Sequence, residues 1–242
     1  MTSSEKDRLQ HEPVHHEHRD VSGGWLRPAV FGAMDGLVTN ASLIAGVGGG
    51  GGSQHAITLT GLAGLAAGAF SMAAGEFVSV SSQNELVQAE VDKERHELTN
   101  NAAAEQIELV GMLRARGISA ATARQAAAEI SAHPDKALSV HAMEELGVDP
   151  AELPSPYVAA GASLVAFAVG AIIPLLPYVL GFDTLWVALV LSALAAVIGG
   201  GLVARLTARP FWRGALRQLV LGVFATGFTY LIGLAVGGLA AG

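Results

Sequence analysis

Apolar residues dominate five long stretches of this chain, and each stretch is long enough to cross a bilayer core, which needs roughly 20 residues. A polar region separates the second stretch from the third. The predicted spans are residues 28–47, 57–80, 158–180, 185–206 and 219–241. The strict alternation typical of a half-buried strand appears nowhere. The pattern therefore predicts an all-α membrane protein with five transmembrane helices.

The same pattern divides the chain into four parts. These are a disordered tail (1–27), transmembrane helices one and two (28–83), an acidic helical module between spans two and three (84–153), and transmembrane helices three to five (154–242). The second span has no helix breaker and is expected to continue as helix through residues 83–98. Three further module helices are predicted at 102–116, 119–132 and 136–146, with Gly117 and Gly147 as ends and Ser119 as an N-cap.

Composition supports a membrane protein and removes several classes of chemistry. Only 14% of residues are charged, about half the share of a soluble domain, and 30 glycines suit close helix packing in lipid. The GxxxG spacings at Gly64/Gly68 and Gly233/Gly237 are therefore interpreted as packing contacts. The absence of cysteine excludes disulfides, thiolate metal sites and cysteine nucleophiles. No P-loop, Gly-x-Ser-x-Gly, His-Glu-x-x-His or dinucleotide-binding motif occurs, so neither an enzyme nor an ATP-driven pump is expected.

Charge is distributed unevenly. Residues 84–153 hold thirteen acidic and six basic residues, an excess equal to the net charge of −7 for the whole chain. Such a module attracts cations and not nucleic acid. The loops at 48–56 and 181–184 and the C-terminal end carry no Lys or Arg. Because basic residues favour the cytosolic side, the N-terminus, the module and the arginines at 205–217 are predicted inside and the C-terminus outside.

Two ionisable residues lie within the predicted spans, and such residues are functional candidates by default. Asp35 shares a helix face with Thr39 and Ser42, whereas Glu76 follows Met72 by one helical turn. A carboxylate supplies charge to a divalent cation, and a thioether favours transition metals. The alternatives are a protonated carboxyl bonded to a neighbouring helix and a methionine that only fills space. Together the three side chains favour a transport pathway.

The module carries two glutamate pairs, Glu94/Glu97 and Glu105/Glu108, displaced by eleven residues. On one continuous helix all four would share a face within about 80°. If residues 99–101 break the helix, the pairs would lie on adjacent antiparallel helices. A solvated acidic face is the alternative to a metal site. Further oxygen, sulfur and nitrogen ligands are offered by Glu144, Glu145, Met143 and His141. The tail histidines (11, 15, 16 and 18) are interpreted as part of a solvated segment.

Four segments resemble the vacuolar iron transporter family: residues 35–47, 71–83, 174–178, and 217–222 with 229–230. The resemblance extends over residues 27–242. It implies a five-span homodimer that exchanges ferrous iron or manganese for protons and moves metal out of the cytosol. It also implies a cytosolic helical metal-binding module between spans two and three.

Site residues follow from the resemblance position by position. Asp35 and Met72 match the pore-lining residues of the family, and Glu76 matches the Glu of its Gly-Glu-Tyr segment. The glutamates of the module correspond to Glu94, Glu97, Glu105, Glu108 and Glu145. Where the family commonly has a Met-Met pair, this chain has His141 and Ala142, with Met143 next to them. A histidine ligand shifts the preference among iron, manganese and zinc.

Two functions remain in view. The first is a proton-coupled exporter with no permanently bound cofactor, whose partners are divalent metal ions, protons, the bilayer and a second copy of the chain. The second is a membrane-anchored metal-buffering or di-iron oxidase protein. A ferritin-like centre uses Glu-x-x-His motifs, none of which occurs here, and an anchor needs no carboxylates in lipid. Export is therefore preferred, and compact length, short loops and no targeting signal favour a bacterial plasma membrane.

Overall fold

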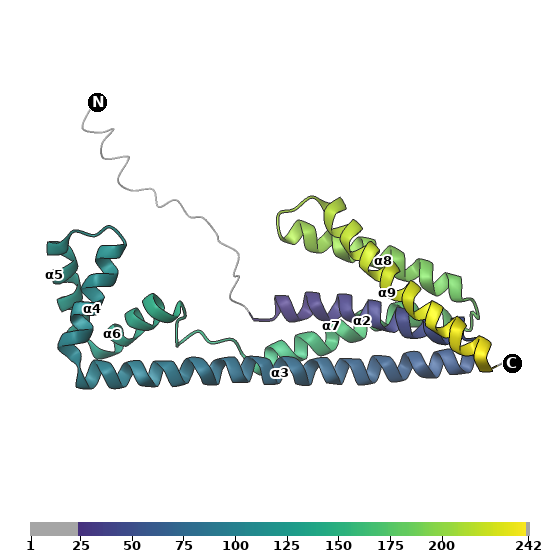
Figure 1. Cartoon of the computed structure of the whole chain (residues 1–242), viewed down its shortest axis with the longest axis horizontal. Coiled ribbons are helices and arrows are strands. Elements are labelled where there is room, and N and C mark those ends of the chain that lie inside the picture. The colour runs from purple at the N-terminus through teal and green to yellow at the C-terminus, as the bar shows by residue number, and fades with distance from the viewer. Residues whose placement is uncertain (1–23, 241–242) are drawn as a thin grey trace, which may run out of the picture.

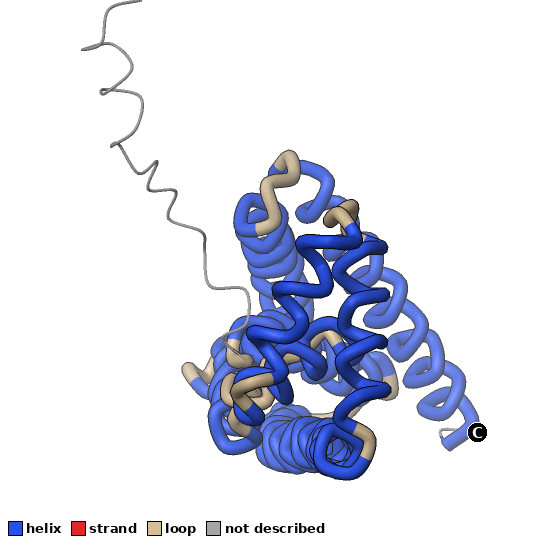
Figure 2. The backbone as a smooth tube through the Cα atoms, turned by 90° about the vertical axis from the view of Figure 1, so that its left-hand side faces the viewer, coloured by secondary structure: helices blue, strands red, loops and turns tan. Residues whose placement is uncertain are grey.

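The structure is a computed structural model that describes residues 24–240, so the histidines of the tail lie outside the described residues. This part of the chain is helical and contains no strand (Figure 2). Its elements are α2 (Leu26–Gly49), α3 (Gln54–Asn100), α4 (Ala102–Ala115), α5 (Ala120–Ser131), α6 (Pro134–His141), the π-helix η1 (Ala142–Leu146), α7 (Pro156–Val179), α8 (Leu185–Leu206) and α9 (Phe211–Ala240). The predicted all-α class is confirmed.

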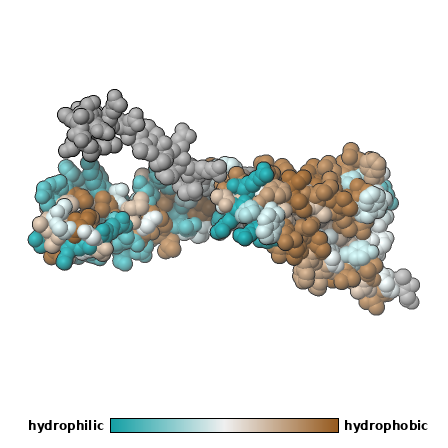
Figure 3. All heavy atoms as spheres, turned by 90° about the horizontal axis from the view of Figure 1, so that it is seen from above, coloured by the Kyte–Doolittle hydropathy of each residue, from teal (hydrophilic) through white to brown (hydrophobic). Residues whose placement is uncertain are grey.

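Five of the described helices are long and apolar enough to cross a membrane, namely α2, α3, α7, α8 and α9. They coincide with the predicted spans, and their surfaces form the hydrophobic half of the molecule (Figure 3). The last span begins as a helix at Phe211, earlier than hydropathy indicates. Arginine is a good helix former, so Arg213 and Arg217 extend the helix beyond its apolar part.

Helices α2 and α7 touch through their backbones. A Cβ atom added at Gly36 would lie 2.2 Å from the carbonyl oxygen of Phe167, and one added at Gly170 would lie 2.0 Å from that of Ala33. No side chain fits at either point. Asn40 reinforces this contact because its buried Nδ2 donates to the Ala171 carbonyl oxygen at 2.6 Å.

Both GxxxG pairs lie at helix contacts, as predicted. A Cβ added at Gly233 would lie 2.0 Å from the Gly46 carbonyl oxygen, so α9 crosses α2 at this point. The neighbours of the other three glycines are Gly50 for Gly237, Leu43 for Gly64 and the Phe167 ring for Gly68. These glycines pack helices together, as helix interfaces in lipid require.

Helix α3 continues without interruption from the bundle into the module. It has 47 residues, which corresponds to about 70 Å at 1.5 Å per residue. Its first half lies among the spans, and its second half extends away from them and carries the module at its end (Figure 1). The predicted continuation of the second span is therefore confirmed.

The chain breaks between α3 and α4 at Asn101, whose φ of −128° and ψ of 31° are not helical. The interpretation with all four glutamates on one continuous helix is therefore wrong. An antiparallel arrangement is not found either, because α4 rises away from the axis of α3 (Figures 1 and 2). The module glutamates consequently meet at a corner and not along a shared face.

The remaining module helices begin and end at recognisable signals. Gly117, with φ of +89°, follows α4, and the Ser119 hydroxyl accepts a hydrogen bond from the Thr122 N–H at the start of α5. The fourth helix begins at Pro134, earlier than predicted, because a proline without an N–H suits the first turn. Its last five residues form the π-helix η1 in place of α-helix, and Gly147 follows with φ of +69°.

Candidate metal centre

Four side chains from four elements converge at the corner between α3 and α4. Glu94 comes from α3, Glu105 from α4, His141 from the end of α6 and Glu145 from η1, and one possible ligand atom from each lies within 4.8 Å of the others. They line a cavity of about 160 Å³. The other lining residues are Glu90, Lys93, Glu97, Glu108, Ala142 and Leu146.

His141 is the centre of the cluster and is completely buried. Its Nδ1 atom lies 3.0 Å from Glu94 Oε1, 3.2 Å from Glu145 Oε1 and 3.7 Å from Glu105 Oε2. Glu94 Oε1 and His141 Nε2 are nevertheless buried without a hydrogen bond. A buried polar atom that lacks a partner costs about 1–3 kcal/mol. A cation bound between the carboxylates would satisfy the glutamate oxygen.

The electrostatics of the cluster also favour a cation. Burial raises the pKa of Glu94 above its ordinary value, and the Glu145 carboxylate raises it further. Burial likewise raises the pKa of Glu105, with Glu108 as the next contribution. His141 acts in the opposite direction on both carboxyls. A divalent ion in the cavity would act in the same direction as His141 and stabilise the charged forms.

Of the eight module residues named from the sequence, Glu144 does not line this cavity, and six do: Glu94, Glu97, Glu105, Glu108, His141 and Glu145. Met143 does not, because its side chain is 46% exposed and points elsewhere. The described cavity therefore offers oxygen and nitrogen atoms but no sulfur. Sequence reasoning missed Glu90 and Lys93. Their positions at helical spacing before Glu94 and Glu97 would have placed them on the same side of α3.

The three predicted pathway residues lie within the spans. Thr39 Oγ1 donates to Asp35 Oδ1 at 3.1 Å, so two of the three residues of the predicted face on α2 are in contact. Glu76 on α3 is buried, and its Oε2 atom has no hydrogen-bond partner. Met72 packs against the apolar cluster that contains Phe167. Among the described residues, no hydrogen bond or ion pair joins Asp35 to Glu76.

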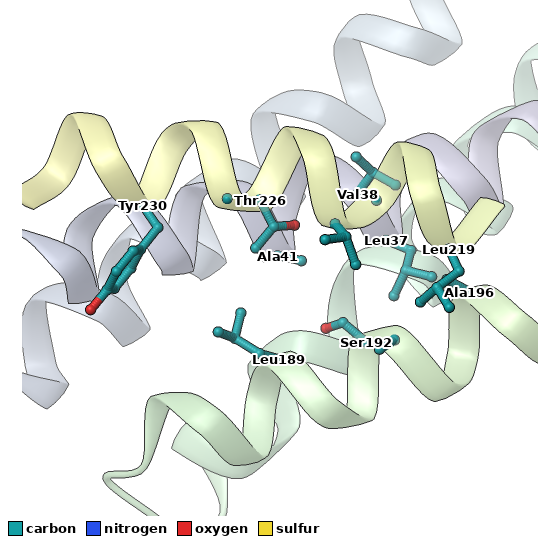
Figure 4. A pocket seen from close by; sticks show the side chains of 13 residues that line it. Leu37, Val38, Ala41, Leu189, Ser192, Ala196, Leu219, Thr226 and Tyr230 are labelled. Atoms are coloured by element: carbon teal, nitrogen blue, oxygen red, sulfur yellow. The ribbon is translucent and has the colours of Figure 1, made fainter. Parts of the chain in front are cut away.

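A larger cavity, of about 270 Å³, lies between α2, α8 and α9 (Figure 4). Its lining is apolar apart from the hydroxyls of Ser192, Thr226 and Tyr230, and it contains no carboxylate. Neither Asp35 nor Glu76 is among its lining residues. This cavity therefore offers no charged ligand for a metal ion.

Comparison with known proteins places this architecture in a family. Residues 26–234 match the model of the VIT family. The chain belongs to the VIT family. Membership agrees with the resemblance found in the sequence, and the matched region includes four spans, the module and most of the fifth span.

Relatives of the chain carry the names of transporters. It is 34% identical over 230 residues to a vacuolar iron transporter of Acanthamoeba castellanii. The aligned region covers 91% of this chain and 79% of the relative. It is 37% identical over 211 residues to vacuolar iron transporter homolog 1 of Oryza sativa subsp. japonica, with coverage of 85% and 71%. Homolog 3 of Arabidopsis thaliana is 37% identical over 216 residues, with coverage of 86% and 84%. These VIT relatives are eukaryotic, so they do not support the expected bacterial plasma membrane.

Proposed function

We propose that this chain is a proton-coupled transporter that exports a divalent transition metal, ferrous iron or manganese, from the cytosol. The observation that carries the proposal is the Glu94–Glu105–His141–Glu145 cluster at the end of α3. The other half of the same helix crosses the membrane. A site suited to cations is thus attached rigidly to a transmembrane helix. The names of the relatives, vacuolar iron transporters, support iron as a substrate.

The module collects the metal. Its carboxylates raise the local concentration of cations, and the cavity provides three carboxylates and one imidazole within coordinating reach of each other. Oxygen and imidazole ligands suit manganese, iron and zinc. The metal is cargo, so no permanently bound cofactor is part of the proposal.

The pathway through the membrane uses Asp35, Met72 and Glu76. The two carboxylates replace part of the hydration shell of the cation, and the thioether favours a transition metal over magnesium or calcium. Asp35 is the proposed site of proton exchange because a proton and a metal ion compete for the same carboxylate oxygens. Thr39 holds this carboxylate in place by its hydrogen bond.

Metal moves away from the side on which the module lies. Figure 1 shows that α3 extends from the same end of the bundle at which α8 connects to α9. That connection and the start of α9 carry Arg205, Arg209, Arg213 and Arg217. The positive-inside rule makes this end cytosolic and the C-terminal end external. The chain is proposed to act as a homodimer, as the family resemblance implies.

Metal uptake into proteoliposomes tests the proposal. Vesicles with the purified protein are offered Fe²⁺, Mn²⁺ or Zn²⁺, with and without an imposed pH gradient. A gradient that is acidic on the side receiving the metal should accelerate uptake of iron or manganese, and protein-free vesicles provide the control. Metal binding without any transport would identify the chain as a membrane-anchored buffer and overturn the proposal.

A further inference from the structure

The helices that line the metal cavity pack against one another to different extents. Helix α6 and the π-helix η1 pack against α3, and α6 also packs against α5. Helix α4 packs against α5 and, more sparsely, against α3. Close backbone packing between α4 and η1 is minor. Nevertheless α4 provides Glu105 and Glu108 to the cavity, and η1 provides Glu145.

One ion pair connects the end of α4 to η1. Arg116 at the C-terminal end of α4 places Nη2 at 2.9 Å from Glu144 Oε2 on η1. No other ion pair connects these two elements in the described part of the chain. The Glu144 side chain is only 15% exposed, whereas Arg116 is 63% exposed. Gly117, with φ of +89°, ends α4 directly after the arginine.

The ion pair also separates two consecutive glutamates. Glu145 lies with Oε1 at 3.2 Å from His141 Nδ1 and lines the cavity. Glu144 does not line the cavity, and its carboxylate contacts Arg116. Consecutive residues of a helix point in different directions, so only one of the two can face the cluster. The arginine binds the glutamate that does not.

We propose that Arg116 is a positioning residue of the metal site, which fixes Glu145 toward His141 by holding Glu144 and by tying η1 to α4. The proposal rests on the proposed function of the module as a metal site. Arg116 is not among the cavity residues, so it acts through Glu144 and does not contact the metal. This ion pair opposes the repulsion between the carboxylates of α4 and η1 when no cation lies between them.

The direction in which metal affinity changes when Arg116 is removed distinguishes positioning from simple charge repulsion. Arg116 carries a positive charge close to a cation site, so through-space repulsion alone predicts that its removal strengthens metal binding. A positioning role predicts the opposite. The Arg116→Met variant should bind Mn²⁺ roughly three- to fivefold more weakly, the size expected when a partly exposed ion pair is lost.

The experiment measures Mn²⁺ binding by the full-length protein in detergent, from the electron paramagnetic resonance signal of free Mn²⁺ at a fixed excess of Mg²⁺. Arg114→Met is the matched control because this exposed arginine lies on the same helix and does not line the cavity. It should leave the affinity unchanged or raise it slightly. Arg95→Met, which breaks the exposed pair with Asp92 on α3, should also have no weakening effect.

Two further variants distinguish positioning from loss of folding. Exchanging the two charges, Arg116→Glu with Glu144→Arg, should restore most of the affinity. In a Glu145→Gln background, Arg116→Met should change the affinity no further, since the group that it positions is already lost. Additive effects of these two substitutions would contradict the proposal even if the single variant binds weakly.

The outcomes of this test are separable from those of the proposed function. If the native protein binds no Mn²⁺ in excess Mg²⁺, the module is not a transition-metal site and the proposed function fails with it. If the native protein binds Mn²⁺ and Arg116→Met binds it equally well or more tightly, the module is a metal site but Arg116 does not position it.

Discussion

The membrane-spanning half and the module are stabilised by different means. In the spans, backbones touch at glycines such as Gly36 and Gly170, and the buried amide of Asn40 is bonded to the neighbouring helix. In the module, three glutamates gather around the buried His141, and burial together with neighbouring carboxylates raises the pKa of Glu94 and of Glu105. Close backbone contact thus holds the first region together, whereas the second gathers like charges that a cation would relieve. The proposed capture of cations by the module rests on this difference.

The largest expected effect is on folding of the bundle. Gly170→Ala places a methyl group about 2.0 Å from the Ala33 carbonyl oxygen, so α2 and α7 must separate. Such overpacking costs typically about 1–3 kcal/mol. The melting temperature and the yield of monodisperse protein should fall. Gly161→Ala on the same helix is the control because its Cβ would meet no atom within 4 Å. Equal stability of the two variants would contradict the close crossing.

The second effect is a loss of transport in a protein that still folds. Asp35→Asn keeps the size of the side chain but removes the exchangeable charge, so we expect transport to fall to less than roughly a tenth of the native rate. Mn²⁺ binding by the module should be unchanged. Uptake and binding are measured on the same preparation. The control is Asp183→Asn in the exposed loop between α7 and α8. Native transport with unchanged pH dependence in Asp35→Asn would remove Asp35 from the pathway.

The third effect separates the module from the pathway. Changing Glu94, Glu97, Glu105 and Glu108 together to Gln should raise the half-saturation constant for metal on the order of tenfold and leave the maximal rate nearly unchanged. The reason is that, in the proposed mechanism, the module supplies metal but does not form the transmembrane route. A matched variant removes the same number of charges at exposed acids outside the cavity: Asp92, Glu129, Asp135 and Glu152. If both variants behave alike, the acidic face acts only through its overall charge.

The smallest effect is on stability of the metal-free chain. The pKa of Glu105 is raised above the ordinary 4.5 in the folded state, so its protonated form is favoured by folding. The stability that this group contributes is complete below pH 4.5 and is lost as the pH rises through the raised pKa. Glu105→Gln should therefore melt slightly higher than the native protein at neutral pH, but not below pH 4.5.

Thermal melting without metal at both pH values measures this effect. The exposed Glu129 on α5, changed to Gln, serves as the control and should melt like the native protein at either pH. Added Mn²⁺ should abolish the advantage of Glu105→Gln because the native carboxylate then has a cation as partner. A lower melting temperature for Glu105→Gln at neutral pH would contradict the electrostatic account of the cavity.

Much of the spanning half could be predicted because one physical requirement dominates there. A helix in lipid must be apolar for about 20 residues, and hydropathy reports that directly. The GxxxG pairs identified contact points for the same reason. The hydrogen bond from Asn40 to α7 was not predicted because its acceptor, the Ala171 carbonyl oxygen, is distant in sequence. Such a contact follows from tertiary packing, which a single sequence does not encode locally.

In the module, local signals predicted the ends of helices but not their arrangement. Gly117 and Ser119 act as expected, and the helix breaks at Asn101, within the segment 99–101 named as a possible break. The direction of α4 and the π-helical form of η1 were not predicted. The outward direction of Met143 was predictable in principle. Residues two apart on a helix do not share a face, so a buried His141 directs Met143 away, while Glu145 stays beside the histidine.

Coupled flux of metal and protons tests the central claim most directly. Proteoliposomes that contain the native protein and an internal pH dye receive an inward Mn²⁺ gradient, with no pH gradient and with the membrane potential clamped. The account predicts that Mn²⁺ entry and proton exit occur together, so that the interior becomes alkaline at a rate proportional to uptake, and that Asp35→Asn abolishes both. Mn²⁺ entry with no change in internal pH would contradict proton coupling, and no Mn²⁺ entry at all would contradict transport itself.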